Sequence, residues 1–287
     1  MAALIPKPKG LERQYGDQFA DAAIVAAYRH RPAYAPEVFT FLRDLVIGQP
    51  RSVLDLGCGT GDVARPLAAL VDTVDAVDPA HRMIEHGRSL PGGDRSNLRW
   101  ILGYAEEVQL PRGTYGLVTA GESLHWMDWS RLLPRLNGLL VPGGFLAIVE
   151  RNVAPNPPWW TEVLVPIQQY TTNRDFQPYS TIAELEQRGL FEPCGVHQAA
   201  ARRFQQSVES YIESIHSRNG FSRDRLTPEA AAAFDAEVRR LLIARYPHGT
   251  LAFDIVSQIT WGRPVGNQTS EVRSQPDHAT RPGSSLS

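Results

Sequence analysis

The stretch Asp55-Leu56-Gly57-Cys58-Gly59-Thr60-Gly61 decides the fold class of this 287-residue chain. An apolar run at 52–56 leads into it, and a helical pattern of apolar residues at 63–71 follows it. Glycines at the end of a strand let the backbone turn sharply and let a ligand approach without a Cβ clash. The stretch therefore predicts a strand, a glycine turn and a helix, with a ligand bound at the turn.

The same alternation continues along the first half of the chain. Further apolar, strand-like runs lie at 73–77, 98–102, 116–120 and 145–150, and helical patterns lie at 36–46, 80–89 and 130–140. Short strands that alternate with helices of this length are typical of βαβ units. The sequence predicts an α/β fold with a mostly parallel sheet and helices on both faces.

The second half has a different pattern. Residues 153–179 are rich in Pro, Trp and Tyr, and a short helix is expected at 181–188. Strand-like stretches at 196–205 and 251–261 flank helical patterns at 207–217 and 228–244. We expect this half to complete the sheet and to form a cap over the ligand site. The ends are polar, which predicts a flexible tail at 1–14 and a disordered tail at 265–287.

Composition and charge exclude several functions. Lys and Arg total 29 against 31 for Asp and Glu, so the net charge of −2 provides no field for nucleic acid or an anionic membrane. The lysines Lys7 and Lys9 both fall in the expected tail, which argues against Schiff-base chemistry. Cys58 and Cys194 have no metal-ligand spacing, so no metal site is expected. Without an apolar stretch long enough for a signal or a membrane span, we expect a cytoplasmic protein.

The residues around the glycine turn indicate what it binds. A dinucleotide loop needs Gly-x-Gly-x-x-Gly, but Asp62 occupies the third glycine position here. A carboxylate at that position repels pyrophosphate, and Asp55 adds a second one. Asp78, at the end of the second predicted strand, can accept hydrogen bonds from both hydroxyls of a ribose. A nucleoside with a cationic extension fits these groups, and S-adenosylmethionine is such a molecule.

The motifs also carry a family resemblance. VLDLGCGTGDVARPLAA at 53–69 and VDAVDPAHRMI at 74–84 resemble the first two motifs of class I S-adenosylmethionine-dependent methyltransferases. GYAEEVQLP at 103–111, SLHWMDW at 123–129 and LLVPGGFLAIV at 139–149 resemble later motifs of the same family. Together with YRHRPAYAPEV at 28–38, these motifs resemble the small-molecule branch of the family, the group related to trans-aconitate methyltransferases, in which a His-Trp pair after the fourth strand recurs.

The resemblance implies a Rossmann-like, seven-stranded sheet in a methyltransferase domain over 15–264. Its cofactor-binding core would span 37–150, and its substrate cap 151–264. The cofactor-binding residues implied by position are Asp55, Gly57, Cys58, Gly59, Asp78, Pro79, Met83, Ala105, Glu106 and Glu122. Two positions depart from the family pattern. Tyr104 stands where an aspartate often reads the adenine amino group, and Gly116 replaces an aspartate at the start of the fourth strand.

The prediction of the site for the methyl acceptor depends on residues for which two interpretations remain open. Tyr28, Arg31, Trp126, Trp129 and Trp159 are candidates for binding the substrate, and each could instead serve packing or capping alone. His125 is the candidate general base, and its alternative is a local hydrogen bond that shapes the loop.

These residues predict methyl transfer from S-adenosylmethionine to a small organic molecule, at the oxygen of a carboxylate or hydroxyl. Three alternatives remain. The chain could be a regulatory protein that binds the cofactor without catalysis, or a methyltransferase of protein or nucleic acid. An NAD-type oxidoreductase is disfavoured by the glycine spacing.

Overall fold

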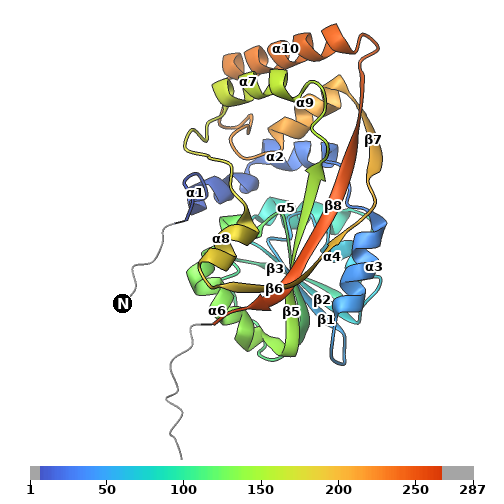
Figure 1. Cartoon of the computed structure of the whole chain (residues 1–287), viewed down its shortest axis with the longest axis vertical. Coiled ribbons are helices and arrows are strands. Elements are labelled where there is room, and N and C mark those ends of the chain that lie inside the picture. The colour runs from blue at the N-terminus through green and yellow to red at the C-terminus, as the bar shows by residue number, and fades with distance from the viewer. Residues whose placement is uncertain (1–6, 267–287) are drawn as a thin grey trace, which may run out of the picture.

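An eight-stranded sheet organises the chain in the computed structural model, which describes residues 7–266 (Figure 1). The strands lie in the order β3-β2-β1-β4-β5-β8-β6, and β7 also pairs with β8. Strands β1 to β5 are parallel, whereas β8 is antiparallel to its neighbours. Their bounds are β1 Ser52–Leu56, β2 Thr73–Asp78, β3 Leu98–Leu102, β4 Tyr115–Gly121, β5 Leu140–Val153, β6 Phe191–Gln198, β7 Arg202–Ser207 and β8 Thr250–Pro264.

The Rossmann-like α/β prediction is confirmed, with one difference in the strand count. The pattern at 196–205 predicts one strand, but 191–207 form two, β6 and β7. Both pair with β8, β6 with 258–264 and β7 with 250–255. The eighth strand therefore arises from a break at 199–201 and adds no new position at the sheet edge.

The helices connect these strands and cover the sheet. The described helices are α1 Arg13–Gly16, α2 Ala22–Ala27, α3 Pro36–Leu45, α4 Ala64–Leu67, α5 His81–Ser89, α6 Trp129–Leu139, α7 Trp160–Tyr170, α8 Thr181–Gln187, α9 Val208–His216 and α10 Pro228–Arg245, with short 3-10 turns η1 Asp17–Ala20, η2 Tyr28–His30 and η3 Leu124–Trp126. Pro36 and Pro228 begin α3 and α10, where a residue without an N–H is tolerated.

Two apolar layers hold the helices on opposite faces of the sheet. Successive side chains of a strand point to opposite faces, and β1 shows this directly. Val53 packs with residues of α3 and α4, whereas Leu54 packs with α6 and α8 on the other face. Because both faces are covered, all five residues of β1 are buried.

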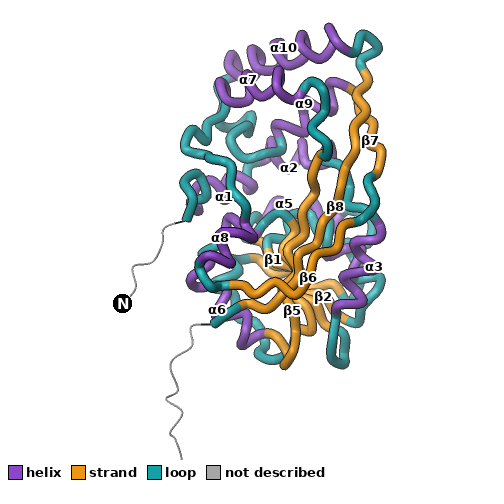
Figure 2. The backbone as a smooth tube through the Cα atoms, in the orientation of Figure 1, coloured by secondary structure: helices purple, strands orange, loops and turns teal. Residues whose placement is uncertain are grey.

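The cap is built from the second half and has a core of its own. Helices α7, α9 and α10 lie beyond the upper ends of the sheet strands, and strands β7 and β8 reach up to them (Figures 1 and 2). Trp159 and Phe234 are at most 1% exposed in this core. Helix α7 differs from the sequence expectation, since 153–179 are only weakly periodic and Pro166 lies inside it.

The N-terminal segment differs from the flexible tail expected over 1–14. Its described part, 7–14, instead packs on the sheet domain: Leu11 is 1% exposed, and the Lys7 ammonium donates to the carbonyl oxygens of His125 and Met127. The segment is polar and therefore suggests a flexible tail, yet it contacts residues more than a hundred positions away along the chain. The parts of the expected tails at 1–6 and 267–287 lie outside the described residues. No helix within 7–266 has the length and hydropathy needed to cross a membrane.

Candidate functional site

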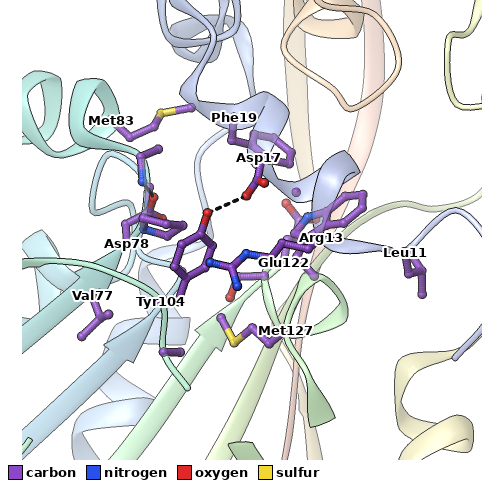
Figure 3. A pocket seen from close by; sticks show the side chains of 18 of the residues that line it. Leu11, Arg13, Asp17, Phe19, Val77, Asp78, Met83, Tyr104, Glu122 and Met127 are labelled. Atoms are coloured by element: carbon purple, nitrogen blue, oxygen red, sulfur yellow. Dashed lines mark hydrogen bonds between the residues drawn. The ribbon is translucent and has the colours of Figure 1, made fainter. Parts of the chain in front are cut away.

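A cavity of about 620 Å³ opens at the carboxyl ends of β1, β2 and β4 (Figure 3). This is the edge at which open α/β sheets bind ligands, and the volume is sufficient for a nucleoside-sized molecule. Of the sequence-predicted site residues, the cavity is lined by Gly57, Gly59, Asp78, Pro79, Met83, Ala105, Glu106, Glu122, Tyr28, Arg31 and Trp126. The structure thus brings together residues from separate segments of the chain.

The glycine turn takes the conformation that its sequence predicts. Gly57 and Gly59 have φ angles of 62° and 54°, a region that L side chains rarely adopt. A Cβ on Gly57 would lie 2.5 Å from the Cβ of Ser123, so the turn also needs glycine for space. The loop therefore leaves its backbone open to the cavity.

Asp55 supports this turn from below and does not line the cavity. Its side chain is 1% exposed, and Oδ1 accepts a hydrogen bond of 2.8 Å from the Thr119 hydroxyl. Burial raises the pKa of Asp55 to about 7 because the low-dielectric surroundings disfavour the charged form. Cys58 likewise is buried and lies outside the cavity lining. Both residues lie in the motif that shapes the site, but neither borders its open space.

Asp78 presents a carboxylate to the cavity. Its Oδ2 accepts from the backbone N–H of Gly59 and its Oδ1 from that of Ala80, both at 2.8 Å. These bonds hold the carboxylate in one orientation. Each oxygen has further lone-pair capacity, so two ribose hydroxyls can still donate to it. Burial raises the pKa of Asp78 to about 6.

Met83 and the Tyr104 ring line one end of the cavity, where a flat ring fits between them (Figure 3). Met83 is 1% exposed and packs with residues of the N-terminal helices, including Phe19. Tyr104, on the other side, donates from its hydroxyl to Asp17 at 2.9 Å, and the Arg13 guanidinium lies 3.3 Å from the Tyr104 ring centroid (Figure 3). Tyr104, which replaces the aspartate of the family pattern, thus anchors the N-terminal segment. Glu106 has a different partner, since its Oε1 accepts from the backbone N–H of Asp128.

The other end of the cavity is charged. Glu122 adopts a φ of 51°, and its Oε2 lies 2.7 Å from Nη2 of Arg151. This pairing, with a further attraction to Arg31, keeps the pKa of Glu122 lowered despite burial, which by itself would raise it. Arg31 donates to the hydroxyl of Ser217 at 2.9 Å and to its carbonyl oxygen at 2.5 Å. A ligand with an ammonium and a carboxylate finds both opposite charges at this end.

Two predicted substrate residues do not reach the cavity. Trp129 is 2% exposed in the core between α6 and the sheet, and its indole N–H donates to the carbonyl of Leu124. Trp159 is 1% exposed among the rings of Tyr211, Tyr246 and Phe253 in the cap core. This placement corrects the expectation for both, because large apolar side chains gain more from full burial than from a partly wet wall.

His125 packs against Trp126, which lines the cavity. The two ring centroids are 4.6 Å apart, and His125 is outside the lining residues. Burial is the main cause that lowers the pKa of His125 to about 4. The imidazole is therefore neutral at pH 7 and a weak base.

Sequence reasoning missed several residues of the site. Lys7, Arg13, Asp17 and Phe19 line the cavity from the N-terminal segment, which carries no recognisable motif. Arg151, by contrast, could be predicted from the sequence as a site residue, because it directly follows the predicted strand 145–150. Among the described residues, no group of three or more His, Cys, Asp or Glu side chains is arranged to hold a metal ion.

Comparisons with known proteins agree with this geometry. Residues 53–144 match a family described as a methyltransferase domain. An uncharacterized methyltransferase of Mycobacterium tuberculosis is 36% identical over 129 residues, which are 45% of this chain and 50% of that protein. The chain thus spans about half the length of such curated relatives.

Solved structures resemble the fold. A methyltransferase structure from Anaeromyxobacter dehalogenans has a TM-score of 0.59 at 22% identity, covering 82% of this chain and 99% of that one. The 4+2 cyclase SpnF has a TM-score of 0.53 at 18% identity, covering 91% and 99%. At these identities the likeness concerns the fold alone. Residues 53–144 are thus similar to a methyltransferase domain, and this match, with the names of the relatives, supports an enzyme of that class.

Proposed function

We propose that this chain is an S-adenosylmethionine-dependent methyltransferase that acts on a small organic molecule, in the branch related to trans-aconitate methyltransferases. The observation that carries the proposal is the oriented Asp78 carboxylate beside the glycine turn of a methyltransferase domain. It supports ribose binding.

The cavity residues fit the two ends of such a cofactor. Met83, Tyr104 and Ala105 line the cavity and would flank the adenine. Glu122 and Arg31 supply the charges for the amino and carboxylate groups of the methionine part. When bound, S-adenosylmethionine supplies a sulfonium methyl group whose departure leaves a neutral thioether.

The residues of this chain would act by binding and positioning. Methyl transfer is an in-line displacement, and most of its acceleration can come from holding the acceptor atom about 3 Å from the methyl group in a dry site. Tyr28, whose hydroxyl accepts from Arg31, and Trp126, which packs against Phe19, line the cavity and would exclude water from it. The Arg31 guanidinium would orient the methionine part.

The lining favours transfer to a carboxylate oxygen. No histidine is among the described residues that line the cavity, and the lowered pKa of His125 makes it a poor general base. A carboxylate is already ionised at pH 7 and needs no base, whereas a hydroxyl does. We therefore propose O-methylation of a carboxylate first and of a hydroxyl second.

Two measurements test the proposal. Isothermal calorimetry should detect binding of S-adenosylhomocysteine by the full chain, with NADH as the control ligand. Methyl transfer from labelled S-adenosylmethionine should then occur with members of a panel of small carboxylic acids and phenols. Binding without transfer to any acceptor, including protein and RNA, would favour a regulatory protein. No binding of S-adenosylhomocysteine at all would refute the proposal.

A further inference from the structure

The cap reaches the charged end of the cavity through Ser217, which ends helix α9. The Ser217 hydroxyl accepts a hydrogen bond of 2.9 Å from Nε of Arg31, and its carbonyl oxygen accepts one of 2.5 Å from Nη2. Arg31 follows η2, which packs against α9, and it lines the cavity. Ser217 is 0% exposed and lies outside the lining. A buried residue of the cap thus holds a cavity residue that is 186 positions away along the chain.

Ser217 is itself fixed by its surroundings. Its hydroxyl donates to the carbonyl oxygen of Ser214 at 2.7 Å, so the lone pairs of the hydroxyl oxygen are left for Arg31. The preceding residue, His216, is 1% exposed, and its Nε2 lies 2.7 Å from Oδ1 of Asp235 in α10. These contacts tie the end of α9 to α10. The two oxygens that meet Arg31 therefore occupy fixed positions.

The bonds to Ser217 decide which edge of the Arg31 guanidinium stays free. A guanidinium carries its N–H donors in a planar fork. Ser217 occupies the edge formed by Nε and Nη2, and the Tyr28 hydroxyl lies 3.4 Å from Nη1. The outer edge, between Nη1 and Nη2, can still donate to both oxygens of a carboxylate. No carboxylate within residues 7–266 is at ion-pair distance from Arg31, so this edge is left for a ligand.

We propose that Ser217 is a positioning residue that makes the enzyme select cofactors by their carboxylate. It holds Arg31 with the outer edge free, so that this edge binds the carboxylate of the methionine part through two hydrogen bonds. The inference rests on the proposed function, in which Arg31 orients the methionine part. Without the Ser217 hydroxyl, the long arginine side chain regains rotamers, and fewer of them have the geometry for a paired contact. Selection for the carboxylate thus depends on a cap residue that lies outside the cavity lining.

The test compares two ligands that differ only in the carboxylate. Calorimetry of the full chain at pH 7.5 measures the affinity for S-adenosylhomocysteine and for its decarboxylated analogue, which keeps the amino group. The wild type should prefer S-adenosylhomocysteine about tenfold or more, because the analogue lacks the charge-assisted contact. Ser217→Ala should lower this preference about fivefold by weakening the binding of S-adenosylhomocysteine alone. Some preference should remain, since the carbonyl oxygen of residue 217 still accepts from Arg31.

A double-mutant cycle shows whether Ser217 acts through Arg31. Arg31→Met should abolish the preference, and the addition of Ser217→Ala should then change it no further. Ser217→Thr keeps the hydroxyl and should restore the wild-type preference. Ser214→Ala is the matched control, because Ser214 is 4% exposed in the same helix and donates in the same way to the carbonyl oxygen of Tyr211, at 2.6 Å. This variant should keep the wild-type preference.

The outcomes separate a positioning role from a structural one. If Ser217→Ala weakens both ligands equally, or changes neither affinity, the inference is wrong. Equal affinity of the wild type for the two ligands would also overturn it, while S-adenosylhomocysteine binding would still support the proposed function. If the wild type does not bind S-adenosylhomocysteine at all, the proposed function fails and the inference fails with it. The two failures therefore give different results in the same titrations.

Discussion

The carboxylate of Glu122 and the guanidinium of Arg151 form an ion pair of 2.7 Å across the carboxyl ends of β4 and β5. The Arg151 side chain is 6% exposed, and its guanidinium also lies 4.3 Å from the ring centroid of Tyr34. The pairing of these two strands ends at Gly121 and Val149, so the ion pair joins β4 and β5 just beyond their last paired residues, at the charged end of the cavity. It also holds Glu122 in a left-handed conformation that a non-glycine residue seldom adopts.

Removal of Arg151 should lower the free energy of unfolding, because Glu122 loses its ion-pair partner. Arg151→Met leaves the Glu122 carboxylate desolvated and unpaired, and we expect a loss of about 3 kcal/mol in the free energy of unfolding at pH 7. The pKa of Glu122 is lowered in the folded state, so the pair stabilises above the unfolded value of 4.5 and this stabilisation disappears as pH falls through the folded pKa. Urea unfolding of both proteins between pH 3 and 7 should show the difference shrinking below about pH 4.5. A difference that is constant over this range would contradict the assignment.

Cofactor binding should depend on the ionisation of Asp78. Only the carboxylate can accept from both ribose hydroxyls, and its pKa is about 6 in the free protein. The affinity for S-adenosylhomocysteine should therefore be constant above pH 7 and fall toward about one tenth at pH 5. Asp78→Ala should weaken binding roughly a hundredfold at pH 7.5, since two charge-assisted hydrogen bonds are lost.

Calorimetry at several pH values measures both effects of the Asp78 prediction. Asp94→Asn, at an exposed position between α5 and β3, is the matched control and should change neither the affinity nor its pH dependence. Equal affinity of Asp78→Ala and the wild type would remove the ribose role from this residue.

The glycine turn should tolerate no side chain at Gly57. Gly57→Ala combines a strained positive φ with a Cβ 2.5 Å from Ser123, and both effects act on the loop that faces the ligand. Gly113 has a similar φ of 58°, but no atom lies within 4 Å of the place a Cβ would occupy, so Gly113→Ala isolates the backbone strain. We expect about 1 kcal/mol of destabilisation for Gly113→Ala and at least about 2 kcal/mol more for Gly57→Ala. Loss of S-adenosylhomocysteine binding should accompany only the second, and equal unfolding midpoints would refute the steric argument.

Lys7 should matter although its neighbour Lys9 does not. The Lys7 ammonium donates to the carbonyl oxygens of Leu11, His125 and Met127, whereas Lys9 is exposed. Lys7→Met should cost about 1–3 kcal/mol and weaken S-adenosylhomocysteine binding, because it releases the loop that carries Trp126. Lys9→Met should leave the unfolding free energy and the affinity unchanged. Equal behaviour of the two variants would show that the N-terminal segment does not hold the loop.

Two tryptophans three residues apart should respond differently to removal. Trp129→Ala empties a core position and should cost about 3–5 kcal/mol of unfolding free energy. Trp126 is half-buried on the cavity wall, so Trp126→Ala should cost about 1 kcal/mol and act mainly on ligand affinity or on KM for the acceptor. Denaturant unfolding and ligand titration of both variants separate the two roles. If Trp129→Ala instead changes mainly ligand affinity and Trp126→Ala mainly the unfolding free energy, Trp129 would belong to the acceptor site.

Local patterns predict the strands of the sheet well. The bounds of β1 and β3 agree with the runs at 52–56 and 98–102. β1 is buried on both faces and is therefore mainly apolar, whereas the edge strand β3 buries Leu98 and Trp100 and exposes Arg99 between them. Helix α7 and the division of β6 from β7 are not predictable in the same way. In both places the deciding contacts come from distant segments, α10 for the helix and β8 for the strands.

The sequence by itself determined the α/β class, the glycine turn and the place of Asp78, since each follows from local periodicity and from residues a few positions apart. Only the tertiary structure decided which aromatic and charged side chains meet at the cavity. Trp126 and Trp129 share one motif, yet one reaches the cavity and the other the core. Arg31, Glu122 and Arg151 come from three parts of the chain and carry no pattern that relates them. Electrostatic interactions depend on distance through space, and spacing along the chain records that distance only within a turn, a strand or a helix.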